Sequence, residues 1–345
     1  MRVQRSKEIH KETLRTSHCP QYIKEGVVMA APLDFEAPII EIENKIAEIK
    51  NMSSLSDSDM QREVDSLQKR LERVKANIYQ RLTPSQKLMV ARHPERPYTL
   101  DFIKLMFTDF LELHGDRLFR DDQALVCGIA NFNDSPVMVI GHQKGRNTKE
   151  NIRRNFGMAS PEGYRKAQRM FDLAERFNRP IITFVDTPGA YPGIEAEERG
   201  QAEAIAKSLM MMAELTVPMI TVITGEGGSG GALAIAMGNR VLMLEHSTYS
   251  VISPEGCASI LWKDASYAGR AAEALKLTAQ DLKELEVIDE IVNEPLGGAH
   301  RNHHQIAHNL KTAIARHLKE IKSLAPKQIF EQRYDKFRNM GVFAE

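Results

Sequence analysis

The chain has 345 residues, of which 46 are Lys or Arg and 46 are Asp or Glu, and 42% of its residues are hydrophobic. This length allows one large core or two domains, while the zero net charge argues against a general nucleic-acid-binding protein. No apolar run reaches the roughly 18–20 residues of a membrane span, and three cysteines without a C-x-x-C pair favour a cytoplasmic protein without disulfides or a zinc ribbon.

Residues 1–28 differ in character from the rest of the chain. They carry six Lys or Arg and three Glu, and they lack the apolar core of a signal peptide. Lys24-Glu25-Gly26 can be encoded by a purine-rich stretch of the ribosome-binding type, at a suitable distance before Met29. We therefore expect natural translation to start at Met29, and residues 1–28 to be a non-native or disordered extension.

Residues 29–90 have the apolar spacing of an arm made of two amphipathic helices. The apolar positions, three or four residues apart in each half, are Ile39, Ile42, Ile46 and Ile49, and then Val64, Leu67, Leu71, Val74 and Ile78. The Ser- and Asp-rich segment 51–60 separates the two halves, so we expect a helical hairpin. Because an apolar seam needs a partner, the arm either docks on another subunit or covers the main domain.

Residues 91–325 are expected to form an α/β domain. A stretch rich in Pro and Arg is followed by a predicted helix over 99–113. Three later segments share a proline that enters an apolar strand, then a loop and a helix, and they are 136–141, 180–185 and 218–223. Repeated strand–loop–helix units bring their loops to the same edge of a sheet, where α/β proteins bind ligands. The remaining pattern predicts an apolar helix at 230–237, strands at 240–244 and 249–252, helices to about 325, and a tail over 326–345.

Five glycines fall within residues 225–231, between a strand-like and a helix-like apolar stretch. Glycine reaches positive φ easily and lets a ligand approach without a β-carbon in the way. A glycine turn that opens a helix also leaves N–H groups without intrahelical partners at the positive end of the helix dipole. The run therefore predicts a site for an oxyanion or a phosphate.

Two chemistries for this loop come from short motifs. Residues 225–230 match the dinucleotide fingerprint G-x-G-x-x-G, but the loop lies late in the chain and the next strand follows after barely two helical turns. Residues 227–231 match G-x-S-x-G, the nucleophile elbow of serine hydrolases, with Ser229 as nucleophile. Its triad partners would have to come from residues outside any recognisable motif, namely His246 or His300 and Asp264 or Asp289.

A third chemistry is a backbone oxyanion hole, in which N–H groups stabilise developing charge and no nucleophilic side chain is needed. Each donor can contribute about 3 kcal/mol. This interpretation predicts a second donor loop after a neighbouring strand, and residues 186–193, Asp-Thr-Pro-Gly-Ala-Tyr-Pro-Gly, supply one. Asp-Thr-Pro-Gly also marks GTPases, but the chain lacks the P-loop G-x-x-x-x-G-K-[ST] that a GTPase requires.

Nine segments stand in one order along the chain: ARHPERPYTLDFI (91–103), GHQKGR (141–146), RRNFGM (153–158), PEGYRKA (161–167), DTPGAYPG (186–193), AEERGQ (196–201), GEGGSGGALAI (225–235), SPEGCASILWK (253–263) and EPLGGAHRN (294–302). Together they closely resemble the alpha-subunit family of bacterial acetyl-CoA carboxylase carboxyltransferases, from about residue 33 to beyond residue 310. The resemblance implies a crotonase-like (ClpP-like) superhelix of ββα repeats, here preceded by the N-terminal helical hairpin.

The same resemblance implies the reaction and its partners. The expected reaction moves a carboxyl group from carboxybiotin on a carrier protein to acetyl-CoA, giving malonyl-CoA, the first committed step of fatty acid synthesis. Biotin is then carried by another protein, and no metal is expected in this chain. The implied partners are a beta subunit of similar fold that bears the zinc ribbon, in an alpha2-beta2 assembly, together with the biotin carboxyl carrier protein and biotin carboxylase. The missing C-x-x-C pair agrees with an alpha rather than a beta subunit.

The resemblance also implies how the glycine loops act. Backbone N–H groups stabilise the charge left on the ureido oxygen of biotin as CO2 departs, the biotin anion deprotonates acetyl-CoA, and a hole on the beta chain stabilises the enolate. No protein base is then required. The expected donors are the N–H groups of Gly230 and Gly231 and, from the second loop, Gly189 and Ala190, while Gly227 and Gly228 shape the turn.

Two alternatives stay open beside this interpretation. One is a self-sufficient hydrolase of related fold that uses Ser229 as nucleophile. The other is a structural subunit whose partner performs all the chemistry. A change of Ser229 to Ala should abolish activity in the hydrolase but leave most activity in the carboxyltransferase. A bulky residue at Gly231 should affect only assembly if the subunit is structural.

Further candidate substrate-binding residues lie outside the glycine loops. His142, Lys144 and Arg146 directly follow a strand at the start of a basic stretch over 142–169, and they either capture CoA phosphates, steer an acidic carrier protein or lie on solvated faces. Tyr191 either lines a pocket or packs in the core. Ser253 either lines the biotin pocket or caps a helix, because a proline follows it. Four histidines at 300, 303, 304 and 308 are interpreted as an exposed helix start rather than a metal site.

Overall fold

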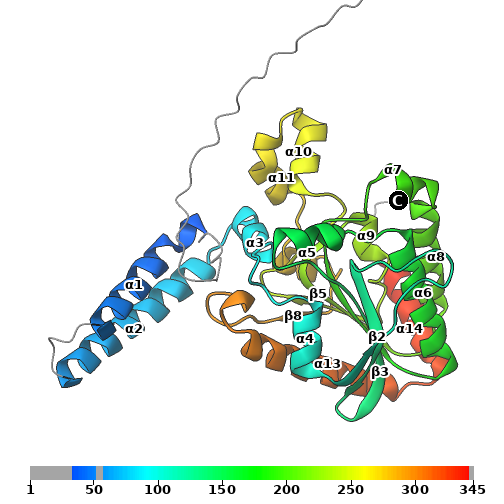
Figure 1. The fold of residues 1–345 in the computed structure, drawn as a ribbon, viewed down its shortest axis with the longest axis horizontal. Coiled ribbons are helices and arrows are strands. Elements are labelled where there is room, and N and C mark those ends of the chain that lie inside the picture. The colour runs from blue at the N-terminus through cyan, green and yellow to red at the C-terminus, as the bar shows by residue number, and fades with distance from the viewer. Residues whose placement is uncertain (1–32, 52–56, 342–345) are drawn as a thin grey trace, which may run out of the picture. The chain divides into compact units, whose positions relative to one another are not determined.

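The computed structural model describes residues 33–51 and 57–341. The predictions for residues 1–28 and for a start at Met29 lie outside these ranges. After a short 3-10 turn, helices α1 (Ala37–Asn51) and α2 (Asp57–Tyr79) run side by side as a hairpin (Figure 1). Ile42 and Ile46 of α1 pack against Val64 of α2, so the predicted apolar seam joins the two helices to each other.

The strands form one mixed sheet. They are β1 (Thr108–Glu112), β2 (Leu125–Phe132), β3 (Ser135–His142), β4 (Ile181–Thr187), β5 (Met219–Gly228), β6 (Arg240–Leu244), β7 (Thr248–Ser250) and β8 (Glu290–Val292). The order across the sheet is β1-β2-β3-β4-β5-β6-β8, with β7 paired to the far end of β5. The pairs β1–β2 and β2–β3 are antiparallel, whereas β3, β4, β5, β6 and β8 are parallel. The three proline-led segments are thus adjacent parallel strands, as the repeat predicts.

The helices beyond the hairpin connect and cover these strands. They are α3 (Pro84–Ala91), α4 (Thr99–Met106), α5 (Thr148–Arg153), α6 (Pro161–Arg176), α7 (Ile194–Glu198), α8 (Gln201–Glu214), α9 (Ser229–Leu233), α10 (Pro254–Trp262), α11 (Ala268–Ala274), α12 (Ala279–Glu284), α13 (His303–Lys322) and α14 (Pro326–Arg338). Of the helices in the described ranges, none combines the length and the apolar character needed to cross a membrane.

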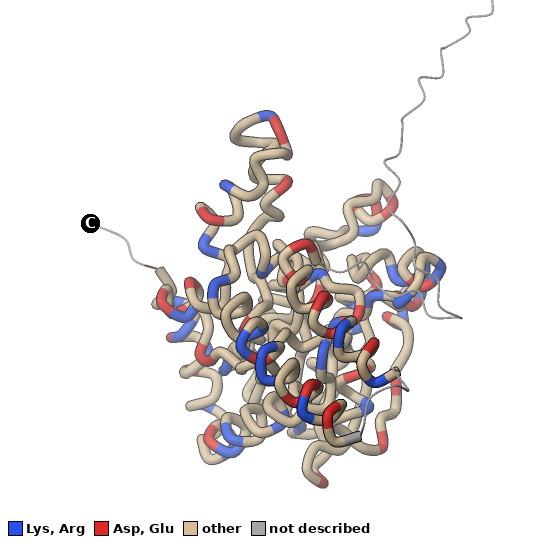
Figure 2. The backbone as a smooth tube through the Cα atoms, turned by 90° about the vertical axis from the view of Figure 1, so that its left-hand side faces the viewer, with Lys and Arg blue, Asp and Glu red and all other residues tan. Residues whose placement is uncertain are grey.

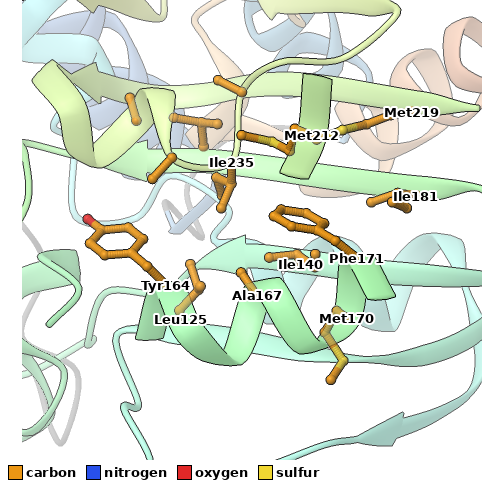
Figure 3. Close-up of a cluster of buried hydrophobic side chains, with 14 of the residues drawn as sticks. Leu125, Ile140, Tyr164, Ala167, Met170, Phe171, Ile181, Met212, Met219 and Ile235 are labelled. Atoms are coloured by element: carbon orange, nitrogen blue, oxygen red, sulfur yellow. The ribbon is translucent and has the colours of Figure 1, made fainter. Parts of the chain in front are cut away.

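The core has one apolar layer on each face of the sheet. On one face, Figure 3 shows Phe171 of α6 directed toward Ile140 and Ile181 of the sheet. On the other face, Phe102 of α4 stacks on Phe184 of β4, with ring centroids 5.6 Å apart, and α13 completes the layer. Strand β4 is buried along its whole length because both of its faces are covered.

The predicted helix over 99–113 is wrong in its second half. Helix α4 ends at Met106, Phe107 is extended, and residues from Thr108 form β1, an edge strand paired with β2. Every residue of β1 is at least partly exposed, and the φ of Asp109, +54°, is incompatible with a continuing right-handed helix.

The predicted apolar helix over 230–237 is also too long. Helix α9 ends at Leu233 after five residues, and β5 continues through the first glycines as far as Gly228. Those glycines are extended because their backbone pairs with β4 on one side and with β7 on the other.

The segment expected as a tail continues the fold as helix α14. Its Arg333 is fully buried, and the guanidinium donates to the carbonyl oxygens of Met212, Leu215 and Val217 at 3.1, 2.5 and 3.0 Å. Burial lowers the pKa of Arg333 to about 10. The arginine thereby satisfies carbonyl groups in and after the last turn of α8 and ties the C-terminal helix to the core.

Candidate active site

The two glycine loops follow neighbouring strands. Strands β4 and β5 pair in parallel from Ile181 with Met219 up to Val185 with Ile223, and after a shift in register Thr187 pairs with Gly227. The shift leaves extra residues in β5, so its glycines curl beside the loop that follows β4. The sequence prediction that a second loop lies at the end of a neighbouring strand is confirmed.

The loops touch through their main chains. A β-carbon on Gly231 would lie 2.4 Å from the nitrogen of Ala190 and 2.4 Å from the carbonyl carbon of Gly189. A β-carbon on Gly228 would lie 2.2 Å from the carbonyl oxygen of Pro188. Because these neighbours are backbone atoms, no side chain can replace hydrogen at either position without moving the loops apart.

The amides of the two loops are differently engaged. The N–H of Gly189 donates to Thr187 Oγ1 at 3.1 Å. The amides of Gly230 and Gly231 lie in the first turn of α9, where an α-helix offers no backbone acceptor. The helix has only five residues, so its dipole is small and the local N–H groups carry the attraction for an anion.

Ser229 stands where the strand turns into the helix. Its φ is +54°, in the left-handed region that L-residues seldom adopt, and the residue is half-buried. Such a turn is typical of a nucleophile elbow, so its surroundings decide whether a triad is present.

The candidate triad partners have other contacts. The ring of His246 packs on Tyr79 at 5.4 Å, and the ring of His300 stacks on His93 at 4.1 Å. Asp264 accepts from the N–H of Ser266, and Asp289 accepts from the N–H of Val241. None of these four candidates contacts Ser229 among the interactions of the described residues. His300 is buried, so the prediction of an exposed segment is wrong at this position, because Glu36, in the 3-10 turn before α1, and His93 lie against it.

His142 and Lys144 lie beneath the loops rather than at the surface. The ring of His142 is fully buried and interacts with the backbone of Phe184 and Gly231. Burial, reinforced by Lys144, lowers the pKa of His142 to about 4, so the ring is neutral at pH 7. The ammonium of Lys144 lies 2.5 Å from Asp186 Oδ1.

Arg146 holds the segment that leads into α4. Its guanidinium donates to the carbonyl oxygens of Pro94 and Arg96, pairs with Asp101 and lies 4.0 Å from the ring centroid of Tyr98. Figure 2 shows basic and acidic positions interspersed along the described backbone, and several cations of the stretch 142–169 have acidic partners, such as Lys166 with Asp121. Capture of CoA phosphates by this stretch stays a prediction.

Ser253 and Tyr191 flank the loops. Ser253 caps α10 by accepting from the N–H of Gly256 at 3.2 Å, and Pro254 occupies the first helical turn, which confirms the helix-start interpretation. Ser253 also lines a small cavity with Gly227 and Gly228. Tyr191 is half-buried, and so the core-packing interpretation does not describe it.

Arg92 and Glu226 belong to the site but carry no sequence signal of their own. The Arg92 guanidinium donates to both carboxylate oxygens of Glu226, at 2.6 and 3.1 Å, and also to Glu255 at 2.6 Å. It therefore joins α3 to the glycine end of β5 and to the start of α10. The hydrogen bond from Arg92 lowers the pKa of Glu255.

A larger cavity of about 390 Å³ lies away from the loops. It is lined by the turn between β2 and β3 and by α13, including Phe132, Lys319 and Lys322. No residue of either glycine loop lines it, so we place the candidate chemistry at the loops, whose main chains are in contact.

Comparison with known protein sequences shows the family to which this chain belongs. Residues 32–341 match the family model described as acetyl co-enzyme A carboxylase carboxyltransferase-like. The chain is 63% identical over 313 residues to the acetyl-coenzyme A carboxylase carboxyl transferase subunit alpha of Geobacter metallireducens, covering 91% of this chain and 98% of that protein. It is 56% identical over 314 residues to the protein of the same name from Thermus thermophilus, covering 91% and 99%.

Solved structures of low identity share the fold. The chain superimposes on transcarboxylase 12S with a TM-score of 0.53 at 20% identity, covering 66% of this chain and 42% of that one. The beta subunit of geranyl-CoA carboxylase from Pseudomonas aeruginosa gives 0.52 at 18% identity, covering 76% and 48%. The chain thus spans less than half of either protein. The crotonase-like α/β fold that the resemblance implies is confirmed.

Proposed function

Since this chain belongs to the acetyl-CoA carboxylase carboxyltransferase-like family, we propose that it is the alpha subunit of an acetyl-CoA carboxylase carboxyltransferase. Family membership makes it part of a carboxyl-transferring enzyme. The proposed reaction moves the carboxyl group of carboxybiotin, presented by the biotin carboxyl carrier protein, to acetyl-CoA. The product, malonyl-CoA, enters fatty acid synthesis.

The observation that carries the proposal is the main-chain contact between Gly231 and the Gly189–Ala190 peptide. It brings the main chains of the two loops together, and Ser229 lies beside them, because a β-carbon on Gly189 would lie 4.0 Å from Ser229 Cβ. Amides preorganised in this way stabilise an oxyanion because they need no reorganisation as charge develops.

Within the two loops, we assign the donors by what each amide already binds. The N–H of Gly189 is occupied by Thr187 Oγ1, which favours Ala190 as the donor from that loop. Gly230 and Gly231 supply the donors of the other loop from the first turn of α9. When bound, the biotin ring supplies the ureido oxygen that takes up negative charge as CO2 leaves.

Gly227, Gly228 and Ser253 line one small cavity, and Tyr191 belongs to the loop over residues 186–193. We propose that these residues contact the biotin ring or the acyl-CoA. Arg146 keeps its proposed role toward CoA phosphates, and a raised KM for malonyl-CoA in Arg146→Met would support it. An unchanged KM would remove Arg146 from the binding site.

The proposed partners follow from the reaction. A beta subunit with a zinc ribbon would complete the acyl-CoA side in an alpha2-beta2 assembly, and biotin carboxylase would recharge the carrier protein. We place this assembly in the cytoplasm. The malonate decarboxylase of Pseudomonas, which shares the fold with a TM-score of 0.52 at 16% identity, is itself a hetero-tetramer.

Co-expression with the beta subunit tests the proposal. The purified assembly should decarboxylate malonyl-CoA in a reaction that requires free biotin, and it should carboxylate acetyl-CoA when carboxylated carrier protein is supplied. The chain alone should do neither. An assembled complex without biotin-dependent turnover would contradict the proposed function.

A further inference from the structure

The Asp186 carboxylate lies at the base of both glycine loops. Asp186 is the third residue before Gly189 and its side chain is 3% exposed. Its Oδ1 accepts the N–H of Glu226 at 3.0 Å, and Glu226 is the second residue before Gly228. One oxygen therefore joins the end of β4 to the end of β5 just before each strand gives way to its loop.

Lys144 holds this carboxylate from a third strand. It follows β3 by two residues, and its ammonium lies 2.5 Å from the same Oδ1 with 14% of the side chain exposed. Gly157, with φ of +81°, packs over the lysine, since a β-carbon there would lie 2.9 Å from Lys144 Cγ. Gly157 thus restricts the position of the lysine side chain, and the ammonium group faces the buried Asp186 carboxylate.

The Asp186 carboxylate packs closely against Gly225 of β5. A β-carbon at this position would lie 2.4 Å from Asp186 Oδ1 and 2.6 Å from Asp186 Cγ. The carboxylate consequently rests against the backbone of β5, and its position sets where the residues after Glu226 begin.

We infer that the Lys144–Asp186 ion pair is a positioning device that fixes the separation of the two donor loops and cancels the carboxylate charge beside the developing oxyanion; this inference rests on the proposed function. An uncompensated carboxylate near the loops would oppose negative charge on a substrate oxygen, and Lys144 removes that opposition. Neither side chain needs to touch the substrate for this role.

Variants of Lys144 and Asp186 should differ in activity according to which buried charge is left unpaired. Lys144→Met leaves Asp186 buried without its cation, and we expect kcat for biotin-dependent malonyl-CoA decarboxylation to fall about 100-fold. Asp186→Asn keeps an acceptor for the Glu226 N–H but loses the charge pairing, and we expect a loss of about 10-fold. The double variant should be faster than Lys144→Met alone, because it removes the stranded carboxylate. KM for malonyl-CoA should stay within about threefold in all three.

A glycine variant moves the carboxylate without changing any charge. Gly225→Ala should displace Asp186 and lower kcat about 10-fold. Its matched control is Gly269→Ala in α11, where a β-carbon would meet only Ser85 Oγ at 3.5 Å, and the control should keep the wild-type rate. Asp172→Asn, which breaks an exposed pair with Arg176, controls for loss of an aspartate charge.

The complex of alpha and beta chains is the sample, with assembly checked by gel filtration and rates measured below the melting temperature. A merely structural pair would lower yield or Tm and leave kcat per assembled site unchanged. Wild-type kcat in assembled Lys144→Met and Gly225→Ala complexes would overturn the inference.

Hydrogen exchange separates this inference from the proposed function. Peptides that cover residues 187–190 and 226–231 should exchange faster in Asp186→Asn than in wild type, whether or not the complex turns over malonyl-CoA. If the wild-type complex is inactive but exchange responds, the proposed reaction fails and the positioning role stands. If the complex is active and neither kcat nor hydrogen exchange of the loop peptides changes in the variants, the positioning role is wrong.

Discussion

A β-carbon on Gly231 would lie 2.4 Å from the backbone nitrogen of Ala190, although the two residues belong to loops that follow different strands. Both sides of the contact are backbone atoms, so no side chain can change its rotamer to make room for a larger residue. The geometry of the candidate oxyanion hole therefore depends on a hydrogen atom at one glycine.

Replacing Gly231 with alanine should abolish most catalysis. The added methyl group must push the second loop away, and displacement of one donor by about 1 Å is expected to lower kcat at least about 100-fold. Turnover of malonyl-CoA in the assembled complex measures the loss, with Gly269→Ala as the control. If Gly231→Ala impaired assembly alone and assembled complexes kept the wild-type kcat, the subunit would be structural and its partner would supply the chemistry.

Ser229→Ala should leave most activity in place. The proposed mechanism uses amides rather than the hydroxyl, and no described histidine contacts Ser229, so we expect kcat within about threefold of wild type. Mass spectrometry after incubation with an acylating serine reagent supplies a second measurement. A stable acyl adduct on Ser229, together with complete loss of turnover in the alanine variant, would establish the hydrolase alternative.

The strands and their loops could be predicted because their signals are local. A proline, an apolar run and a glycine-containing loop recur within single segments, and a repeat of parallel units places the loops at one edge. The prediction that the loops at 186–193 and 225–231 lie together followed from this rule and from the oxyanion-hole interpretation, which requires a second donor loop after a neighbouring strand. The residue roles at the loops rest on the resemblance, and they stay proposals until the variants are measured.

The contacts that organise the site could not be predicted, because they join residues far apart in the chain. Lys144 and Asp186 meet only because β3 and β4 are neighbours. His300 is buried because an N-terminal element, with Glu36 and His93, covers it. The length of α9 was overestimated at its C-terminal end, where the N–H groups of Ile235 and Ala236 donate to carbonyl oxygens three residues earlier and the helix stops at Leu233.

The buried pair of Arg96 and Glu294 should be costly to break from one side. Both side chains are almost fully buried, at 1% and 0% exposure, and Arg96 also donates to the carbonyl oxygen of Thr224 at 2.7 Å. Although burial opposes ionisation, the Arg96 charge lowers the pKa of Glu294 to about 2. Arg96→Met strands the carboxylate, and we expect the free energy of unfolding to fall by about 3–5 kcal/mol.

Urea unfolding measures this cost, and Arg96→Met/Glu294→Gln should lose less than Arg96→Met. Lys327→Met, which breaks an exposed pair with Glu331, serves as the matched control and should change stability by less than about 1 kcal/mol. Equal losses of unfolding free energy in Arg96→Met and Lys327→Met would show that burial does not raise the cost of breaking the Arg96–Glu294 pair.

Acid should destabilise this fold through its buried histidines. Burial, followed by the charges of His93 and Arg301, lowers the pKa of His300 to about 3, and burial lowers the pKa of His93 and His246 and takes that of His142 to about 4. Between these values and the ordinary 6.5, the unfolded chain binds more protons than the folded one. The free energy of unfolding therefore falls as pH drops below about 6.5, by up to about 1.4 kcal/mol per pH unit for each such histidine.

Urea midpoints measured at about pH 7.5 and about pH 5.5 test this sign. His300→Leu should narrow the difference between the two midpoints, because it removes a buried ring whose nitrogens have no hydrogen-bond partner among the described residues and whose Nε2 lies 3.9 Å from Glu36 Oε1. His304→Leu, on the exposed face of α13, should keep the wild-type difference. A midpoint that rises on acidification, or a His300→Leu variant as acid-sensitive as wild type, would mean that Glu36 compensates the protonated ring and that burial of His300 does not control the acid response.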